Sequence, residues 1–290
     1  MIDGFSQSES MFAGDEPSPA ERAPRKDGRA SGLEDEKNHL PTLVILGPTG
    51  SGKTGVSIKI AKEIGGEVIS ADSRAIYKGM DIGTAKPTKE EQSGIPHYAL
   101  DLVEPGERFT VADWKTYAEE KIKEIKARGN VPIIAGGTGL YIDALIYDYK
   151  FKGPTGKKIG DLEQKSCSDR TEVKGDFLLI GIKWEADDLR ARLKKRADEM
   201  FREELYDETK KLVEKYGWNS QAMKSNIYQF VDAYLSGAMS LEEAKEKFVY
   251  DDWHLAKRQM TWFKRNKEII WLTLEEVYPY VINYLSKTKK

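Results

Sequence analysis

The chain has 290 residues, 39 % of them hydrophobic, which suffices for one large domain or two small ones with a true core. No apolar stretch approaches the roughly 18 residues of a membrane span, and the basic-then-apolar layout of a secretory signal is missing from its start. The formal net charge of −2 neither demands nor excludes a nucleic-acid partner, and the single Cys167 excludes an internal disulfide. We therefore expect a cytoplasmic enzyme that makes no contact with a membrane.

Composition divides the chain in two. Residues 1–40 are rich in Ser, Glu, Asp, Arg, Gly and Pro and hold few large apolar side chains. Such a segment cannot bury enough surface to offset the entropy of ordering, so we predict a disordered leader. The folded part is expected to span 41–290.

Strands and helices are predicted to alternate from Pro41 onward. The expected strands are 43–46, Glu67–Ala71, Val131–Ala135, Phe177–Ile182 and the short Ile269–Leu272. Helices are expected over 53–64, over 110–128 with Thr110 as N-cap, and after the turn Gly136–Gly139. This alternation predicts an α/β fold: a P-loop NTPase-like parallel sheet with helices on both faces.

A helical C-terminal portion is predicted over 186–267, as a lid or a helical subdomain. Its first, long helix is expected to bury Leu189, Leu193, Ala197, Met200 and Leu212, which recur at spacings of three and four or near-multiples. A capping box at Ser240–Glu243 predicts another helix, and a further one is expected over about 252–267. A last helix follows the final strand. Residues 150–175 have almost no apolar residues and are expected to be a loop or a poorly ordered insertion.

The strongest motif directly follows the first apolar strand. It reads Gly47-Pro48-Thr49-Gly50-Ser51-Gly52-Lys53-Thr54, the phosphate-loop pattern in its confirming strand–loop–helix context. In such a loop the backbone N–H groups wrap a di- or triphosphate, and the start of the helix adds its positive end. Lys53 would add a point charge, and the hydroxyl of Thr54 would bind Mg²⁺. The chain therefore handles a phosphorylated ligand.

Two further segments end predicted strands. Asp72 follows the strand Glu67–Ala71, and because ligands lie beyond the carboxyl ends of parallel strands, it should face the phosphate loop. There it would hold Mg²⁺ through water or act as a general base, although an Asp that caps the next helix is the competing interpretation. Thr138 in the turn Gly136–Gly139 would contact a phosphate oxygen. A plain strand-to-helix turn with no ligand contact is an equally well supported interpretation.

Two other segments are less specific from their residues. Asp81–Pro87 is polar, contains a Lys with no obvious partner and looks like a loop. The segment 253–265 predicts a basic helix with Arg258, Trp262 and Arg265 on one face, which suits phosphate or base contacts, although a solvated charged face is the commoner explanation. His97 and His254 are isolated, so no zinc site is expected.

Together these segments resemble the tRNA dimethylallyltransferase (tRNA isopentenyltransferase) family. The resemblance is carried by 47–54, 69–73, 76–87, Ile95–His97, Gly136–Tyr141 and Ala256–Phe263, in matching order and rough spacing. It implies transfer of a dimethylallyl group from dimethylallyl diphosphate to the exocyclic amine of the adenosine 3′-adjacent to the anticodon in tRNA. It also implies Mg²⁺ as cofactor, an anticodon loop as partner, and a monomer.

The resemblance assigns roles to individual residues. Asp72 would take the proton from the adenine amine, Lys53 would assist departure of the diphosphate, and Thr138 would hold the diphosphate side. Thr49 would lie beside Asp72, and Thr54 would be the metal ligand. The residues implied in tRNA binding are Asp72, Ser73, Arg74, Ala75, Lys257, Arg258, Gln259 and Arg265.

The chain also departs from the family pattern. The helical insertion that embraces the anticodon stem-loop in most members is strongly shortened here, to about 150–175. Ile227-Tyr228-Gln229 stands where Gly-Tyr-Arg is usual, and Trp253 stands where an Arg is usual. These departures concern the parts that grip RNA, so they bear on the acceptor more than on the reaction.

Three alternatives remain open on sequence. The first is prenylation of free adenine nucleotide, as in cytokinin-forming relatives that lack the insertion. The second is a small-molecule kinase whose Arg-rich lid is supplied by Arg190, Arg192, Arg196 and Arg202, although the spacing of Arg192 and Arg196 better suits surface packing. The third, a non-catalytic nucleotide-binding module, requires Asp72 and Lys53 to be idle.

Overall fold

One six-stranded parallel sheet organises the protein. The computed structural model describes residues 40–151, 172–220 and 222–288. The strands are β1 (Thr42–Leu46), β2 (Gly66–Ala71), β3 (His97–Tyr98), β4 (Val131–Gly136), β5 (Phe177–Ile182) and β6 (Ile270–Leu272). Their order is β3-β2-β4-β1-β5-β6, and every neighbouring pair is parallel. The predicted parallel sheet is confirmed. The predicted leader, apart from Leu40, most of 150–175 and Cys167 lie outside the described residues.

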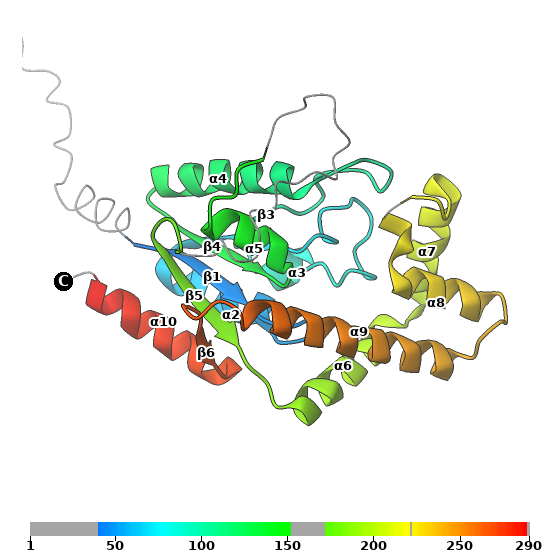
Figure 1. The fold of residues 1–290 in the computed structure, drawn as a ribbon. Coiled ribbons are helices and arrows are strands. Elements are labelled where there is room, and N and C mark those ends of the chain that lie inside the picture. The colour runs from blue at the N-terminus through cyan, green and yellow to red at the C-terminus, as the bar shows by residue number, and fades with distance from the viewer. Residues whose placement is uncertain (1–39, 152–171, 221, 289–290) are drawn as a thin grey trace, which may run out of the picture.

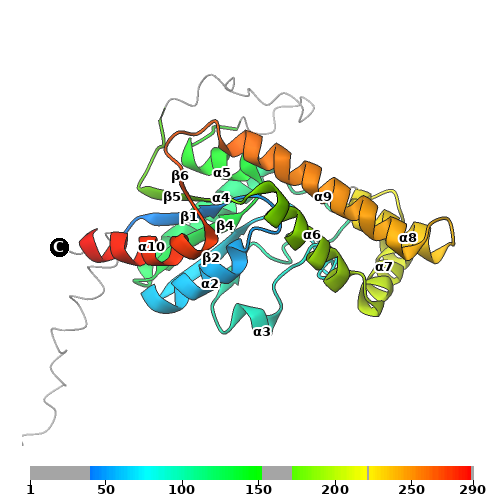
Figure 2. The ribbon, with the colours of Figure 1, turned by 90° about the horizontal axis from the view of Figure 1, so that it is seen from below.

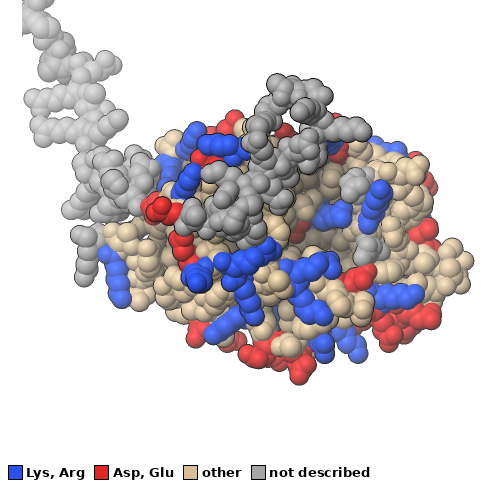
Figure 3. Space-filling view, in the orientation of Figure 1, with Lys and Arg blue, Asp and Glu red and all other residues tan. Residues whose placement is uncertain are grey.

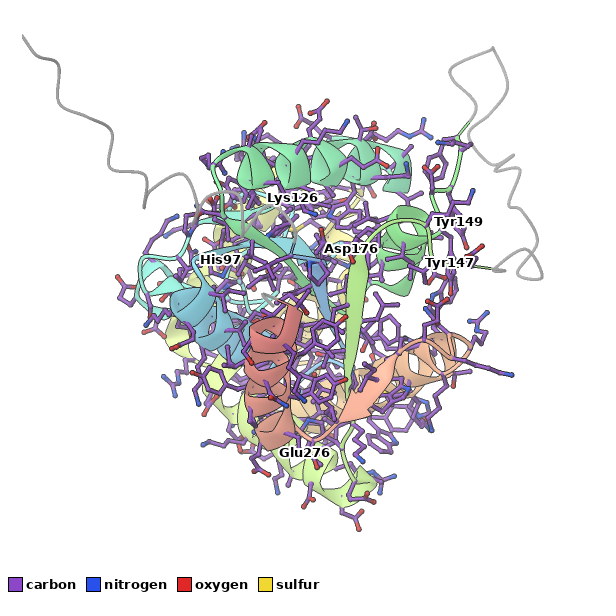
Figure 4. The ribbon with its side chains drawn as sticks, turned by 90° about the vertical axis from the view of Figure 1, so that its left-hand side faces the viewer. His97, Lys126, Tyr147, Tyr149, Asp176 and Glu276 are labelled. Carbon is purple, nitrogen blue, oxygen red and sulfur yellow. The ribbon has the colours of Figure 1, made fainter. Side chains whose placement is uncertain are left out.

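Helices cover both faces of this sheet, as predicted (Figures 1 and 4). Alternate residues of β1 point to opposite faces, as a strand requires. Val44 and Leu46 belong to a core shared with α4 (Val111–Ala127) and α5 (Gly139–Ile146). Leu43 and Ile45 belong to a second core shared with α2 (Lys53–Ile64) and α10 (Leu274–Thr288). Beyond α5, Tyr147 and Tyr149 stack with ring centroids 6.3 Å apart, at the edge where Figure 4 labels them.

The helical portion comprises α6 (Ala186–Met200), α7 (Glu203–Tyr216), the short 3-10 turn η2 (Ala222–Lys224), α8 (Asn226–Leu235) and α9 (Leu241–Phe263). These helices form a third core, to which the loop residues Ile76 and Met80 also belong. In Figures 1 and 2, α6 and α9 run side by side, and Leu189, Leu193 and Ala256 are buried between them. The portion therefore packs against the segment that follows β2.

Two helix predictions are wrong. The expected long helix from 186 to 212 ends at Met200, because the chain turns at Phe201 and Arg202 and buries the Phe201 ring against Phe248. The separate helix expected over 252–267 is the second half of α9. Its capping box at Ser240 is formed as predicted, and no Gly or Pro interrupts the helix before its end at Phe263.

Two short elements were not predicted. They are β3 and the four-residue helix α3 (Lys89–Gln92), which Thr88 caps through a capping box. The Thr110 cap of α4 is confirmed, again as a full capping box. Within the described ranges, none of the helices combines the length and apolar character that crossing a bilayer requires.

Candidate active site

A hollow of about 900 Å³ lies where β1, β2 and β4 end. The predicted site residues that line it are Thr49, Gly50, Ser51, Gly52, Lys53, Thr54, Asp72, Ser73, Arg74, Ala75, Thr138, Arg258 and Gln259. Gly47, Pro48, Lys257 and Arg265 are not among its lining residues. The fold thus joins three segments that are far apart in sequence: the phosphate loop, the end of β2 and the turn after β4.

The phosphate loop needs its glycines for conformation and for space. Gly50 and Gly52 have φ of 73° and 87°, in the left-handed region that disfavours side chains. A Cβ on Gly50 would also lie 2.8 Å from Leu193 on α6. Helix α6 therefore packs directly on the loop, which only a bare backbone at this position allows.

Lys53 folds back onto its own loop. Its ammonium donates hydrogen bonds to the carbonyl oxygens of Pro48 at 2.6 Å and Gly47 at 3.1 Å. Burial lowers the pKa of Lys53 to about 8; the nearby charge of Asp72 raises it and that of Arg196 lowers it further. A buried ammonium bonded only to neutral groups is a prepared site for an anion.

Asp72 follows β2 as expected, lines the hollow and also caps the turn that follows it. Its Oδ1 accepts a hydrogen bond from the backbone N–H of Arg74 at 2.8 Å, which fixes the turn as a capping Asp would. The charge of the same carboxylate raises the pKa of Lys53, against the larger effect of burial, so the two charged groups lie near each other in the hollow. Its second oxygen is available to a ligand.

Thr138 is held in place by the neighbouring strand end. Its hydroxyl oxygen accepts from the backbone N–H of Ser73 at 3.0 Å, and its own N–H donates to the carbonyl of Ala71 at 3.0 Å. Because Ala71 and Ser73 flank Asp72 in the chain, these two bonds fix Thr138 relative to Asp72.

Two arginines of α6 reach the phosphate loop, which overturns the expectation that Arg192 and Arg196 serve surface packing. Arg192 donates to the carbonyl of Gly50 at 2.9 Å and stacks on Trp184 at 4.6 Å. Arg196 donates to the hydroxyl of Thr49 and forms an ion pair with Asp252 on α9 at 3.2 Å. The sequence carried a signal for this, since both arginines lie on one helical face, but the position of α6 depends on tertiary packing.

Helix α9 closes the other side of the loop. The side-chain oxygen of Gln259 accepts from the N–H of Thr49 at 2.8 Å, and its amide nitrogen donates to the carbonyl of Gly137 at 3.0 Å. A Cβ on Gly137 would lie 2.5 Å from that nitrogen. Gln259, predicted to contact tRNA, thus joins the loop to the turn after β4, and this glycine makes room for it.

Trp262 occupies the next position along the turn. A Cβ on Gly139 would lie 2.2 Å from its indole, whose Nε1 donates to Asp143 at 2.9 Å. The guanidinium of Arg265 lies over the same indole, 4.5 Å from the ring centroid. Arg258 is exposed at the rim of the hollow, so it is not buried against the sheet.

Residues 83–87 line one wall of the hollow, and the start of the segment 81–87 is held by α7. The Glu208 carboxylate on α7 accepts from the N–H groups of Asp81, Ile82 and Gly83 at 3.0, 2.8 and 2.9 Å, and from the Tyr228 hydroxyl at 2.8 Å. Lys86, which had no obvious partner on sequence, is buried against Asp81 and Asp101 at 2.5 and 2.6 Å. Sequence reasoning missed Glu208 because its partners are backbone groups more than 120 residues away.

The donor set of the hollow suits magnesium. The hydroxyl of Thr54 and the carboxylate of Asp72 line the same space, beside a loop shaped for phosphates. Oxygen ligands together with substrate phosphates are what Mg²⁺ prefers in proteins.

Known proteins resemble this chain over most of its length. The family model described as IPP transferase matches residues 75–165 and 153–266. The tRNA dimethylallyltransferase of Pelotomaculum thermopropionicum is 36 % identical over 297 aligned positions, which cover 84 % of this chain and 94 % of that protein. Those positions outnumber the 290 residues of this chain, so the relative carries residues that this chain lacks.

Solved structures agree. The crystal structure of the tRNA isopentenylpyrophosphate transferase of Staphylococcus epidermidis matches with a TM-score of 0.72 and 35 % identity, over 86 % of this chain and all of that one. The full-length enzyme of Bacillus halodurans matches with a TM-score of 0.74 and 31 % identity, over 86 % of this chain and 96 % of that one. The chain belongs to the tRNA dimethylallyltransferase (IPP transferase) family.

Proposed function

We propose that this chain transfers the dimethylallyl group of dimethylallyl diphosphate to the exocyclic amine of an adenosine 3′-adjacent to the anticodon of a tRNA. Its family makes it a prenyltransferase. The observation that carries the proposal is that Lys53 of the phosphate loop, Asp72 and Thr138 line one hollow.

The donor end of the hollow is built for a diphosphate. Lys53 and the first turn of α2 supply positive charge, and Arg192 and Arg196 approach the loop from α6. Stabilising the negative charge that develops on the departing diphosphate lowers the barrier to breaking the carbon–oxygen bond. Bound Mg²⁺, held by Thr54 and through water by Asp72, would neutralise part of the same charge.

The acceptor end centres on Asp72. As the adenine amine attacks, a nitrogen–carbon bond forms, the bond to the diphosphate breaks, and the Asp72 carboxylate takes the amine proton. The hydrogen bond from Arg74 holds one carboxylate oxygen and leaves the other for this proton. Because the hollow lies at the edge of the sheet, the adenosine must leave any stack to enter, at a cost of a few kcal/mol.

The test is a comparison of acceptors. Purified protein is incubated with labelled dimethylallyl diphosphate and either bulk tRNA or AMP. Label in tRNA, and none after Asp72→Asn, supports the proposal. Label in AMP instead would favour the free-nucleotide alternative, which the shortened insertion motivates, and phosphoryl transfer from ATP would favour a kinase.

A further inference from the structure

Two short segments concentrate positive charge in a chain whose net charge is −2. The seven residues 190–196 on α6 hold five Lys or Arg and no acid, and the thirteen residues 253–265 hold four and no acid. Lys and Arg side chains gather over α9 on the face drawn in Figure 3. A concentration of this kind attracts polyanions.

Packing brings these two segments together. Leu189 and Leu193 of α6 bury their side chains against Ala256 of α9, so the charged residues of both helices border one strip of surface. A second hollow of about 550 Å³ opens between them and shares no lining residue with the catalytic one. We define this α6–α9 face by six of its residues: Arg190, Lys194, Tyr250, Trp253, His254 and Lys257. The hollow is also lined by Ala191, Val249 and one carboxylate, that of Glu246, so three cations face a single acid.

The cations of this face are separate from those of the active site. Arg192 and Arg196 bind the phosphate loop, whereas Arg190, Lys194 and Lys257 are exposed and do not line the catalytic hollow. Within residues 40–151, 172–220 and 222–288, these three have no carboxylate partner. Their charge is therefore left for a ligand.

Aromatic rings lie between these cations. Trp253 is flanked by Arg190 and Lys257, with the charged groups 4.4 and 5.8 Å from the ring centroid. Tyr250 is 63 % exposed, and its ring lies 4.3 Å from that of His254. The exposed ring of Tyr250 among cations suits an unpaired base, which stacks on the ring while its phosphate meets the charges.

We infer that the α6–α9 face binds the RNA strand that flanks the modified adenosine. This inference rests on the proposed function, in which the acceptor is a tRNA. Lys257 on this face is the chain neighbour of Arg258 at the rim of the catalytic hollow. The two hollows are lined by different faces of α9, and both Lys257 and Arg258 are exposed, so a strand that places its adenosine in the catalytic hollow would reach the α6–α9 face over the exposed side of this helix. The face supplies an RNA contact on the domain itself, in a chain shorter than its aligned relative.

The test measures tRNA affinity without donor across a range of salt concentrations. Lys194→Ala/Lys257→Ala should flatten the plot of log affinity against log salt by about 1.5, because each lost phosphate contact lowers the slope by ~0.7–0.9. Tyr250→Ala should weaken binding about tenfold with the slope unchanged, as expected for a lost stack. The matched control is Lys210→Ala/Lys211→Ala, which removes two exposed charges of α7.

Affinity for dimethylallyl diphosphate should stay at the wild-type value in all variants. A wild-type salt slope in the Lys194/Lys257 variant overturns the inference. The inference is also overturned if Tyr250→Ala changes the oligomeric state and leaves the RNA affinity unchanged. That result would show that the face binds a second copy of the chain. If the slope falls as expected but wild-type protein never labels tRNA, the proposed function fails and the RNA-binding face stands.

Discussion

The side chain of Gln259 accepts a hydrogen bond from the backbone N–H of Thr49 at 2.8 Å, across 210 residues of sequence. The same amide donates to Gly137, so one residue of α9 holds the phosphate loop and the turn after β4 together. The position of the diphosphate site relative to Thr138 therefore depends on a helix at the far end of the chain.

Replacing Gln259 should disturb that arrangement. Gln259→Ala removes the partners of two part-buried groups, the N–H of Thr49 and the carbonyl of Gly137, so the free energy of unfolding, measured by denaturant titration, should fall by about 1–3 kcal/mol. We also expect a higher KM for dimethylallyl diphosphate. Thr261→Ala is the matched control, because its hydroxyl bonds only the carbonyl of Lys257 in its own helix. Equal behaviour of the two variants would refute the role of Gln259.

Asp72→Asn tests the general base. The amide can still accept the hydrogen bond from Arg74, so the turn should keep its shape. Turnover should fall at least ~10²-fold, the low end for loss of a general base. Binding of dimethylallyl diphosphate, measured by calorimetry, should change little. Near-normal turnover would remove Asp72 from the mechanism.

The pKa of Lys53, lowered to about 8 by burial, predicts a pH dependence of donor binding. Above this pH the free enzyme carries a neutral Lys53, so affinity for dimethylallyl diphosphate should fall as the pH rises through about 8. Lys53→Arg stays charged throughout and should show no such fall. A fall of the same size in both proteins would assign the titration to another group.

Glu208→Ala should loosen the segment 81–87. Three backbone N–H groups and the Tyr228 hydroxyl lose their acceptor, so the free energy of unfolding should fall by at least ~2 kcal/mol. The control is Glu204→Ala, an exposed carboxylate on the same helix. Equal melting temperatures of the two variants would show that the anchor contributes nothing.

Local signals in the sequence predicted five of the six strands and the three segments of the site that follow β1, β2 and β4. Hydrophobic runs, the glycine loop and the caps at Thr110 and Ser240 depend on neighbouring residues, and each is found where expected. The break at Phe201 was missed because it follows from burial against Phe248, a contact across the helical portion.

The contacts that α6, α7 and α9 make with the site could not be predicted either, because they also depend on tertiary packing. The basic segment 253–265 looked like one face, but the structure divides it between the catalytic hollow, which holds Arg258 and Gln259, and the outer face with Lys257. That division depends on how α9 packs on α6. Glu208 and Asp252 likewise acquire their roles only through tertiary contacts.

The most direct test of the central claim is mass spectrometry of tRNA nucleosides from cells that lack this gene and from the same cells after its return. We predict that dimethylallyl-modified adenosine is missing from tRNA in the first case and restored in the second. The Asp72→Asn gene should not restore it. Unchanged modification without the gene, or restoration by the Asp72→Asn variant, would contradict the account.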